Sequence, residues 1–237
     1  MKRINAVARL PALVAALSAA PVMAADFDVS IQNVTRGIYF TPLLVAAHDS
    51  GTRLFSIGSA ASANLQAMAE GGDISGLEAD LTAVAATQSN NPAGGLLAPG
   101  DSTTVTLNTD GAPANTQLSI AGMLLPTNDG FVAANSLTLP TAAGEYTYYL
   151  NGYDAGTEAN DEIRGSGTPG QAGFPVPGPL DSAVGTNGTG LPATAEGFVH
   201  IHRGVIGDTD ASGGLSDIDS TLHRWLTPVA KLTITVR

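Results

Sequence analysis

Cysteine is absent from all 237 residues, so no disulfide can stabilise this chain. The motifs G-x-S-x-G and H-E-x-x-H and the P-loop, each typical of a large enzyme class, are absent as well. Stability must therefore come from a packed core or from bound ions. Nothing in the sequence carries a signature of nucleophilic catalysis, so we expect a protein that is not an enzyme.

Basic residues are scarce: 10 Lys and Arg stand against 21 Asp and Glu, which gives a formal net charge of -11. A chain this acidic is poorly suited to nucleic acid or to anionic membrane surfaces. The acidity suits divalent cations as partners, although it also serves simply to keep a protein soluble. We expect no nucleic-acid partner.

Long hydrophobic runs are missing too, with one exception at the start of the chain. The apolar stretch 10–23 is shorter than the roughly 20 residues that span a bilayer. It follows the basic start MKR and ends in VMA, which places small residues where a signal peptidase cuts. These features predict a signal peptide over residues 1–24, a single domain over 25–237, no transmembrane segment, and a secreted or periplasmic protein.

Alternation of apolar and polar residues with a period of two dominates the remaining sequence. Turn-forming segments such as NTDGAPAN and PTAAG separate the alternating runs, which include FDVSIQ, TTVTLNT, QLSIAGML, EYTYYLNGY and VAKLTITVR. Many short strands with one buried face are typical of an antiparallel β-sandwich. The sequence therefore predicts an all-β protein.

Two segments depart from this alternation. Residues 59–89 read as two short helices bounded by glycines, and we place them as one helical insertion against one end of the sheets. Residues 165–196 are dense in Gly and Pro and have no usable period. They predict a long surface loop, and loops of this length are usually functional or mobile.

The segment NGYDAGTEAND follows one of two strands that are predicted to form a hairpin around PTAAG. In an antiparallel pair, the start of the first strand lies beside the end of the second, so Asp129 and Asp154 become neighbours. Gly156 allows a sharp turn that brings Glu158 to the same place.

Three carboxylates that converge on one point repel each other unless a cation lies between them or one takes up a proton. Calcium, which takes six to eight oxygen ligands with flexible geometry, is the natural occupant. The alternative is two ordinary turns in which Asp precedes Gly or bonds to its own backbone. Spacing alone slightly favours the ordinary turns over a cation site.

Several segments together resemble the spondin N-terminal domain in the form found in bacterial exported proteins. They are FDVSIQNVT, TPLLVAAHDSGTRLFSIGSAAS, LQAMAEGGD, NDGFVAANS and YDAGTEAND, and the likeness extends from about Phe27 to Val236. The resemblance implies a β-sandwich similar to C2 domains that binds Ca²⁺ at one end, with ligands at Asp129, Asp154 and Glu158. Glu158 stands where animal members carry Asp, which lengthens one ligand side chain. The cysteines that cross-link animal members are missing, so the matrix role of animal members cannot be assumed for this chain.

A second acidic loop, DTDASGGLSDID, partly matches an EF-hand template. Asp208, Asp210, Ser212 and Asp219 occupy ligand positions 1, 3, 5 and 12, and Gly213 occupies position 6. Asp at position 12 is shorter than the usual Glu, and no helices flank the loop. A weaker second cation site and a polar surface loop remain equally compatible with this pattern.

The segment VHIHRG places His200 and His202 on one face of a strand. Together with His48, His223 or an acid, the pair could ligate a transition metal. The simpler interpretation puts both histidines on the solvent face, with Val199 and Ile201 buried and no carboxylate nearby.

The leading hypothesis is an exported, calcium-binding module that binds a cell-surface or matrix protein or glycan, as in adhesion. One alternative is a metal-dependent enzyme that uses a histidine and carboxylate site. The other is a C2-like module that attaches to lipid through calcium, which the acidic surface disfavours.

Overall fold

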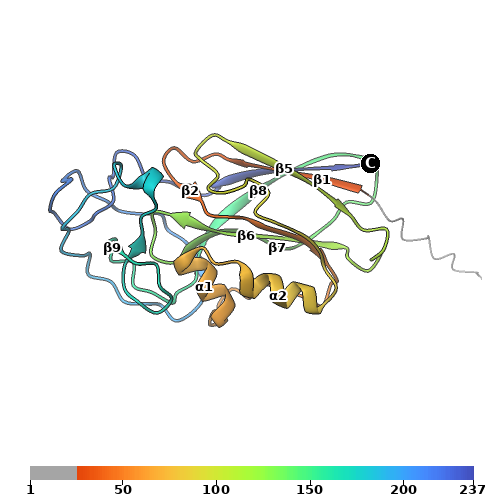
Figure 1. The fold of residues 1–237 in the computed structure, drawn as a ribbon, viewed down its shortest axis with the longest axis horizontal. Helices are drawn as coiled ribbons and strands as arrows, with labels where there is room; N and C mark the ends of the chain where they lie inside the picture. The colour runs from red at the N-terminus through yellow and green to blue at the C-terminus, as the bar shows by residue number, and fades with distance from the viewer. Residues whose placement is uncertain (1–25) are drawn as a thin grey trace, which may run out of the picture.

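The structure, a computed structural model, describes residues 26–237, and the predicted signal peptide lies outside them. Within the described residues the fold is antiparallel β with two short α-helices, which confirms the predicted all-β class (Figure 1). No helix in this part of the chain is long and apolar enough to cross a membrane. The elements are β1 (Asp26–Asn33), β2 (Tyr39–Phe40), β3 (Leu44–His48), α1 (Ala63–Gly71), α2 (Ser75–Ala83), β4 (Thr87–Asn90), β5 (Ser102–Asn108), β6 (Gln117–Leu125), β7 (Gly130–Thr138), β8 (Gly144–Asp154), β9 (Arg164–Gly165), β10 (Phe174–Pro175), the 3₁₀ turn η1 (Gly178–Leu180), β11 (His200–Ile201) and β12 (Ala230–Val236).

The described strands form one large sheet in the order β4-β3-β6-β7-β8-β12-β1-β5, with β2 paired to β6 and β11 paired to β8. Strand β8 is where the sheet turns, because its residues 144–150 pair with β12 and its residues 151–154 pair with β7. Strands β4 and β5, at the two ends of this order, contact each other. The sheet therefore curls until it is nearly closed, and its two halves face each other.

The main core fills the space between these halves. In β1 the alternating residues Phe27, Val29 and Ile31 are buried, as the period of two predicts, and they meet Leu232 and Ile234 of β12. Residues of β3, β6 and β7 complete the same cluster from the other half. Burial of these apolar side chains is the main source of stability in a chain without cysteine.

The predicted helical insertion is confirmed as α1 and α2. Helix α1 begins after Ser62, whose hydroxyl accepts the Leu65 amide at 3.1 Å, and ends at Gly72, which adopts φ +72°. The helices cover the outer face of β3, β6 and β7 rather than one end of the sheets (Figure 1). A second, smaller core lies beneath them and includes Leu65 and Phe131.

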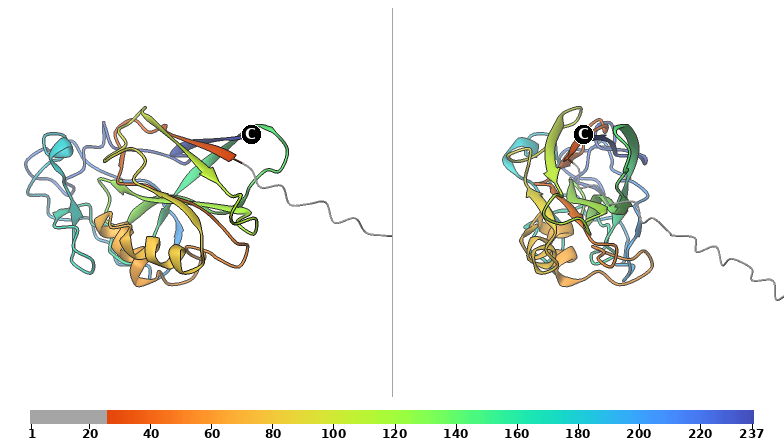
Figure 2. Two further views of the ribbon diagram at one scale, coloured as in Figure 1. Left: turned by 45° about the vertical axis from the view of Figure 1, so that its right-hand side comes forward. Right: turned by 90° about the vertical axis from the view of Figure 1, so that its right-hand side faces the viewer.

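Long connections gather at one end of the molecule, opposite the C-terminus (Figures 1 and 2). Segment 165–196 belongs to this end and contains parts of two short strands and η1. Phe174 and Leu180 are fully buried in the main core, so the segment is anchored and is not only a surface loop. These connections lie around the end of β8, where Asp154 is the last residue.

Candidate metal centre

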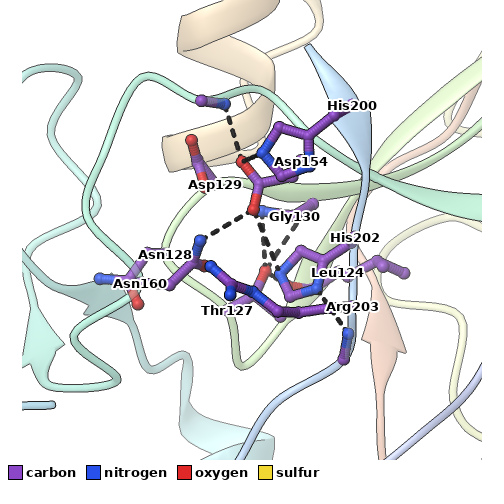
Figure 3. A network of polar contacts seen from close by, with 12 residues as sticks. Leu124, Thr127, Asn128, Asp129, Gly130, Asp154, Asn160, His200, His202 and Arg203 are labelled. Atoms are coloured by element: carbon purple, nitrogen blue, oxygen red, sulfur yellow. Dashed lines mark hydrogen bonds and ion pairs between the residues drawn. The ribbon is translucent and has the colours of Figure 1, made fainter. Parts of the chain in front are cut away.

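Asp154 lies between two neighbouring strands at the point where β8 ends. Across the sheet it is paired with Gly130 of β7 on one side and with His200 of β11 on the other. The predicted neighbourhood of Asp129 and Asp154 is therefore present, and β11 adds a third chain segment beside them (Figure 3). Because the sheet register fixes these positions, the side chains of the three segments meet without dependence on loop flexibility.

Asp129 is a fully buried carboxylate with one oxygen satisfied and one not. Its Oδ2 accepts the amides of Thr157 and Glu158 at 2.7 and 3.1 Å. Its Oδ1 is buried and has no hydrogen-bond partner. Burial, and next the adjacent charge of Asp154, raise the pKa of Asp129 to about 7. A buried, unpaired carboxylate oxygen beside a second carboxylate is an arrangement that a cation or a proton would stabilise.

The Asp154 carboxylate is held by its own turn. Its Oδ1 accepts the Gly156 amide and its Oδ2 accepts the Asn160 side-chain amide, both at 2.8 Å. Gly156 adopts φ +67°, and a Cβ there would lie 2.4 Å from the Phe198 carbonyl oxygen. The sharp turn predicted at this glycine is therefore required by both backbone conformation and space.

Glu158 joins this region through its main chain rather than its carboxylate. Its Oε1 accepts the Asn128 side-chain amide at 2.8 Å and also the Gly173 amide. Burial raises the pKa of Glu158. The structure therefore brings together Asp129 and Asp154, while the third predicted carboxylate is directed toward Asn128 and the loop at Gly173. A direct role for Glu158 as a calcium ligand stays a prediction.

His200 of β11 is partly buried, and His202, which follows the strand, is buried, so the prediction that both lie on the solvent face is wrong. His202 is buried, and the exposed residue of the strand is Ile201. His200 Nε2 lies 3.6 Å from Asp154 Oδ1, and His202 Nε2 lies 3.9 Å from Asp154 Oδ2. Burial lowers the pKa of His202 to about 4, against the opposing effect of Asp154. His202 is therefore neutral at neutral pH.

Glu196 is a site residue that the sequence analysis missed. Ligand atoms of Asp154, Glu196 and His200 all lie within 4.8 Å of one another, which is a separation that one metal ion could bridge. Glu196 is four residues before His200, and its Oε2 lies 3.8 Å from His200 Nε2. The spacing E-x-x-x-H-x-H could have indicated Glu196 as a ligand. The spacing is informative only when the chain is known to fold back between Glu196 and His200.

The acidic loop 208–219 closes on itself at the same end of the molecule. Asp208 and Asp219 form an isolated parallel bridge, and the Asp208 carboxylate accepts the amides of Asp210, Leu215 and Ser216. These backbone bonds, the Ser216 amide first, lower the pKa of Asp208. The Asp208 carboxylate thus already accepts hydrogen bonds from amides within the loop. Cation binding by Asp208, Asp210, Ser212 and Asp219 stays a prediction.

The fold and these contacts define a β domain in which side chains able to bind a metal ion gather at the end of one strand. The family model Spondin_N matches residues 31–168, more than half of the chain. The chain therefore belongs to the spondin N-terminal domain family, a non-catalytic kind of extracellular domain, as the resemblance predicts. No curated protein matches the chain at a significant level. The match includes Asp129, Asp154 and Glu158 and ends before Glu196, His200 and His202.

Proposed function

We propose that this protein is an exported, non-catalytic spondin-type module that holds Ca²⁺ between Asp129 and Asp154 and binds an extracellular protein or glycan. The observation that carries this proposal is the buried, unpartnered Oδ1 of Asp129 beside a second buried carboxylate. Family membership supports the extracellular, non-enzymatic part of the proposal. The signal-like residues 1–24 support export.

The donor chemistry of this pair fits calcium. Asp154 is the last residue of β8, and Asp129 directly precedes Gly130 of β7, with which Asp154 is paired, so strand pairing brings the two carboxylates together. Calcium accepts carboxylate oxygens readily and can complete its shell with main-chain oxygens and water. When bound, the ion would offset both the burial and the repulsion by Asp154 that raise the pKa of Asp129. The role of the ion here is to order the end of the domain, at which the long connections gather.

Two other functions receive less support. Attachment to an anionic membrane would require basic surface residues, and the chain has 10 Lys and Arg against 21 acids. An enzyme would require a nucleophile or an activated water facing a substrate cleft. The carboxylates of Asp129 and Asp154 accept backbone and amide hydrogen bonds within the fold, which suits ligands of a stabilising ion better than general acids.

The test is thermal unfolding of the mature protein with calcium or with chelator. Calcium binds the folded state, so the midpoint should rise, and the gain is about 2.7 kcal/mol at roughly 100 times the dissociation constant. Asp129→Asn and Asp154→Asn should each remove most of this shift. Asp101→Asn, which alters an exposed acid outside the site, should leave it unchanged. Equal midpoints for the wild type with and without calcium would refute the proposal.

Glu158→Gln completes the series because Gln keeps the size of the side chain. If Glu158 is a third ligand, this variant loses the calcium shift together with the two aspartate variants. If its carboxylate serves only the loop contacts with Asn128 and Gly173, the variant is destabilised but keeps the shift. Binding to glycan and matrix-protein arrays, with Asp129→Asn as the calcium-deficient control, then tests the partner class.

A further inference from the structure

We propose that Asp154, Glu196 and His200 form a second metal position, which takes a transition-metal ion of the Zn²⁺ class. This position shares Asp154 with the proposed calcium pair and lies on the β11 side of it (Figure 3). It is a mixed nitrogen and oxygen site, whereas the calcium pair contains oxygen alone. Two of its three ligands, Glu196 and His200, lie beyond the part of the chain that the family model matches.

The hydrogen bonding of His200 leaves its Nε2 atom free to bind a metal ion. His200 Nδ1 lies 3.0 Å from the Ile201 carbonyl oxygen. A carbonyl can only accept, so Nδ1 must carry the proton, and Nε2 of the neutral ring is left with a free lone pair. That Nε2 is buried without a hydrogen-bond partner. A backbone carbonyl that fixes the tautomer of a histidine in this way is a common second-shell feature of metal sites.

Glu196 is oriented by a neighbouring cation. Its Oε1 accepts a hydrogen bond from the Arg203 guanidinium at 3.2 Å, while its Oε2 is buried and has no partner. Oε2 lies 3.8 Å from His200 Nε2, and Asp154 Oδ1 lies 3.6 Å from the same nitrogen. Both separations are too long for hydrogen bonds. An ion centred among atoms spaced in this way lies a little over about 2 Å from each, close to the lengths of Zn–N and Zn–O bonds.

His202 has the opposite tautomer and therefore a different role. Its Nδ1 accepts the Gly204 amide at 2.9 Å, so the proton of the neutral ring is on Nε2. This N–H is buried without a partner and points toward Asp154 Oδ2 at 3.9 Å. The His202 side chain is only 2% exposed. His202 therefore offers no lone pair to the ion and acts as a positioning residue that packs beside the Asp154 carboxylate, whereas His200 is the nitrogen ligand.

The set of ligands selects the class of metal. Calcium prefers six to eight oxygen ligands, whereas imidazole nitrogen suits zinc, copper, nickel and iron. Three protein ligands leave at least one coordination position open. The side chains of Glu196 and His200 are 20% and 22% exposed, so that position is within reach of solvent. The bound ion would therefore present an exchangeable coordination position at the surface of the domain.

Binding of Zn²⁺ and of Co²⁺ to the mature, metal-stripped protein tests this inference. We expect one Zn²⁺ per chain by calorimetry, and a visible Co²⁺ spectrum that Zn²⁺ displaces. His200→Ala and Glu196→Gln should each weaken binding by at least about 100-fold, whereas His202→Phe should weaken it by about 10- to 100-fold, as for other second-shell losses. Glu145→Gln, which alters an exposed acid at the far end of β8, is the matched control and should bind as the wild type does.

The outcomes separate this inference from the proposed function. Asp129→Asn should lose the calcium shift and keep Co²⁺ binding, while His200→Ala should keep the calcium shift and lose Co²⁺ binding. Co²⁺ or Zn²⁺ binding that is equally tight in the wild type, His200→Ala and Glu196→Gln would overturn the second site and leave the calcium proposal standing. If His200→Ala does not fold, the partly exposed Glu196 gives the decisive variant through Glu196→Gln.

Discussion

Replacing Asp129 with Asn removes a charge from the buried carboxylate pair while preserving the size of the side chain. In the metal-free protein, burial and the charge of Asp154 raise the pKa of Asp129 from 3.8 to about 7. The folded state then holds a proton between these pH values that the unfolded state has lost. Stability from this group is therefore fully present below pH 3.8 and is lost as pH rises toward about 7.

The size of the effect follows from the pKa difference. The rise of the Asp129 pKa from 3.8 to about 7 corresponds to at most about 4 kcal/mol, because neighbouring groups relax when Asp129 ionises. His202 acts in the opposite direction, since burial lowers its pKa from 6.5 to about 4. Its contribution is absent below about pH 4 and grows as pH rises to 6.5. In the wild type, the pH-dependent contributions of Asp129 and His202 to stability therefore partly cancel. A variant that removes one of the two groups is needed to measure the contribution of the other.

The assay is urea unfolding in chelator across this pH range, with the free energy of unfolding of Asp129→Asn compared with that of the wild type. We expect the variant to gain stability relative to the wild type as pH rises from 4 to 8, by about 2 to 4 kcal/mol. Saturating calcium should remove or reverse this trend, because an ion that keeps Asp129 ionised lowers its folded-state pKa in the wild type. A difference between the two proteins that does not change with pH would refute the reasoning.

Further predictions concern packing and the second acidic loop. Gly152→Ala should destabilise the fold by about 1 to 3 kcal/mol in urea unfolding, because the new Cβ would lie 2.5 Å from the Trp225 ring. Gly178→Ala is the control and should be nearly neutral, because no atom would lie within 4 Å of its Cβ. Phe131→Ala should cost about 3 to 5 kcal/mol, because this fully buried ring packs against Phe55 and Tyr153 beneath the helices. Asp208→Ala should loosen the 208–219 loop, measured by its amide hydrogen exchange, and leave the calcium shift of the main site intact; loss of that shift would move the primary site to this loop.

Local patterns predicted much of the fold. The alternation of Phe27, Val29 and Ile31 identified β1, and glycines marked the ends of the helical insertion. The hairpin argument also placed Asp129 beside Asp154 correctly. These inferences succeeded because each depends on alternation along one strand or on the connection between two consecutive strands. The predicted hairpin forms only at its open end, where residues 130–133 pair with 151–154, because residues 144–150 of β8 pair with β12 instead.

The inferences that failed depend on long-range pairing. Period two placed His200 and His202 on one face, but it could not say which face is inside, since β11 is a two-residue strand whose orientation is set by its partner β8. Glu196 has no pattern of its own and becomes part of the site only through that pairing. The direction of the Glu158 carboxylate likewise depends on Gly173, in a loop without periodicity.

The pairing of Asp154 with His200 also has an evolutionary consequence. The chain leaves the sheet after Asp154 and returns directly opposite that residue, so both ends of the intervening segment are fixed at one pair. The entropic cost of closing such a loop grows only logarithmically, by about 0.6 kcal/mol for each doubling of its length. Insertions near its exposed turns would therefore leave strand register intact. The exposed turns of this segment can therefore vary in length, while the sheet and the buried anchors Phe174 and Leu180 stay constant.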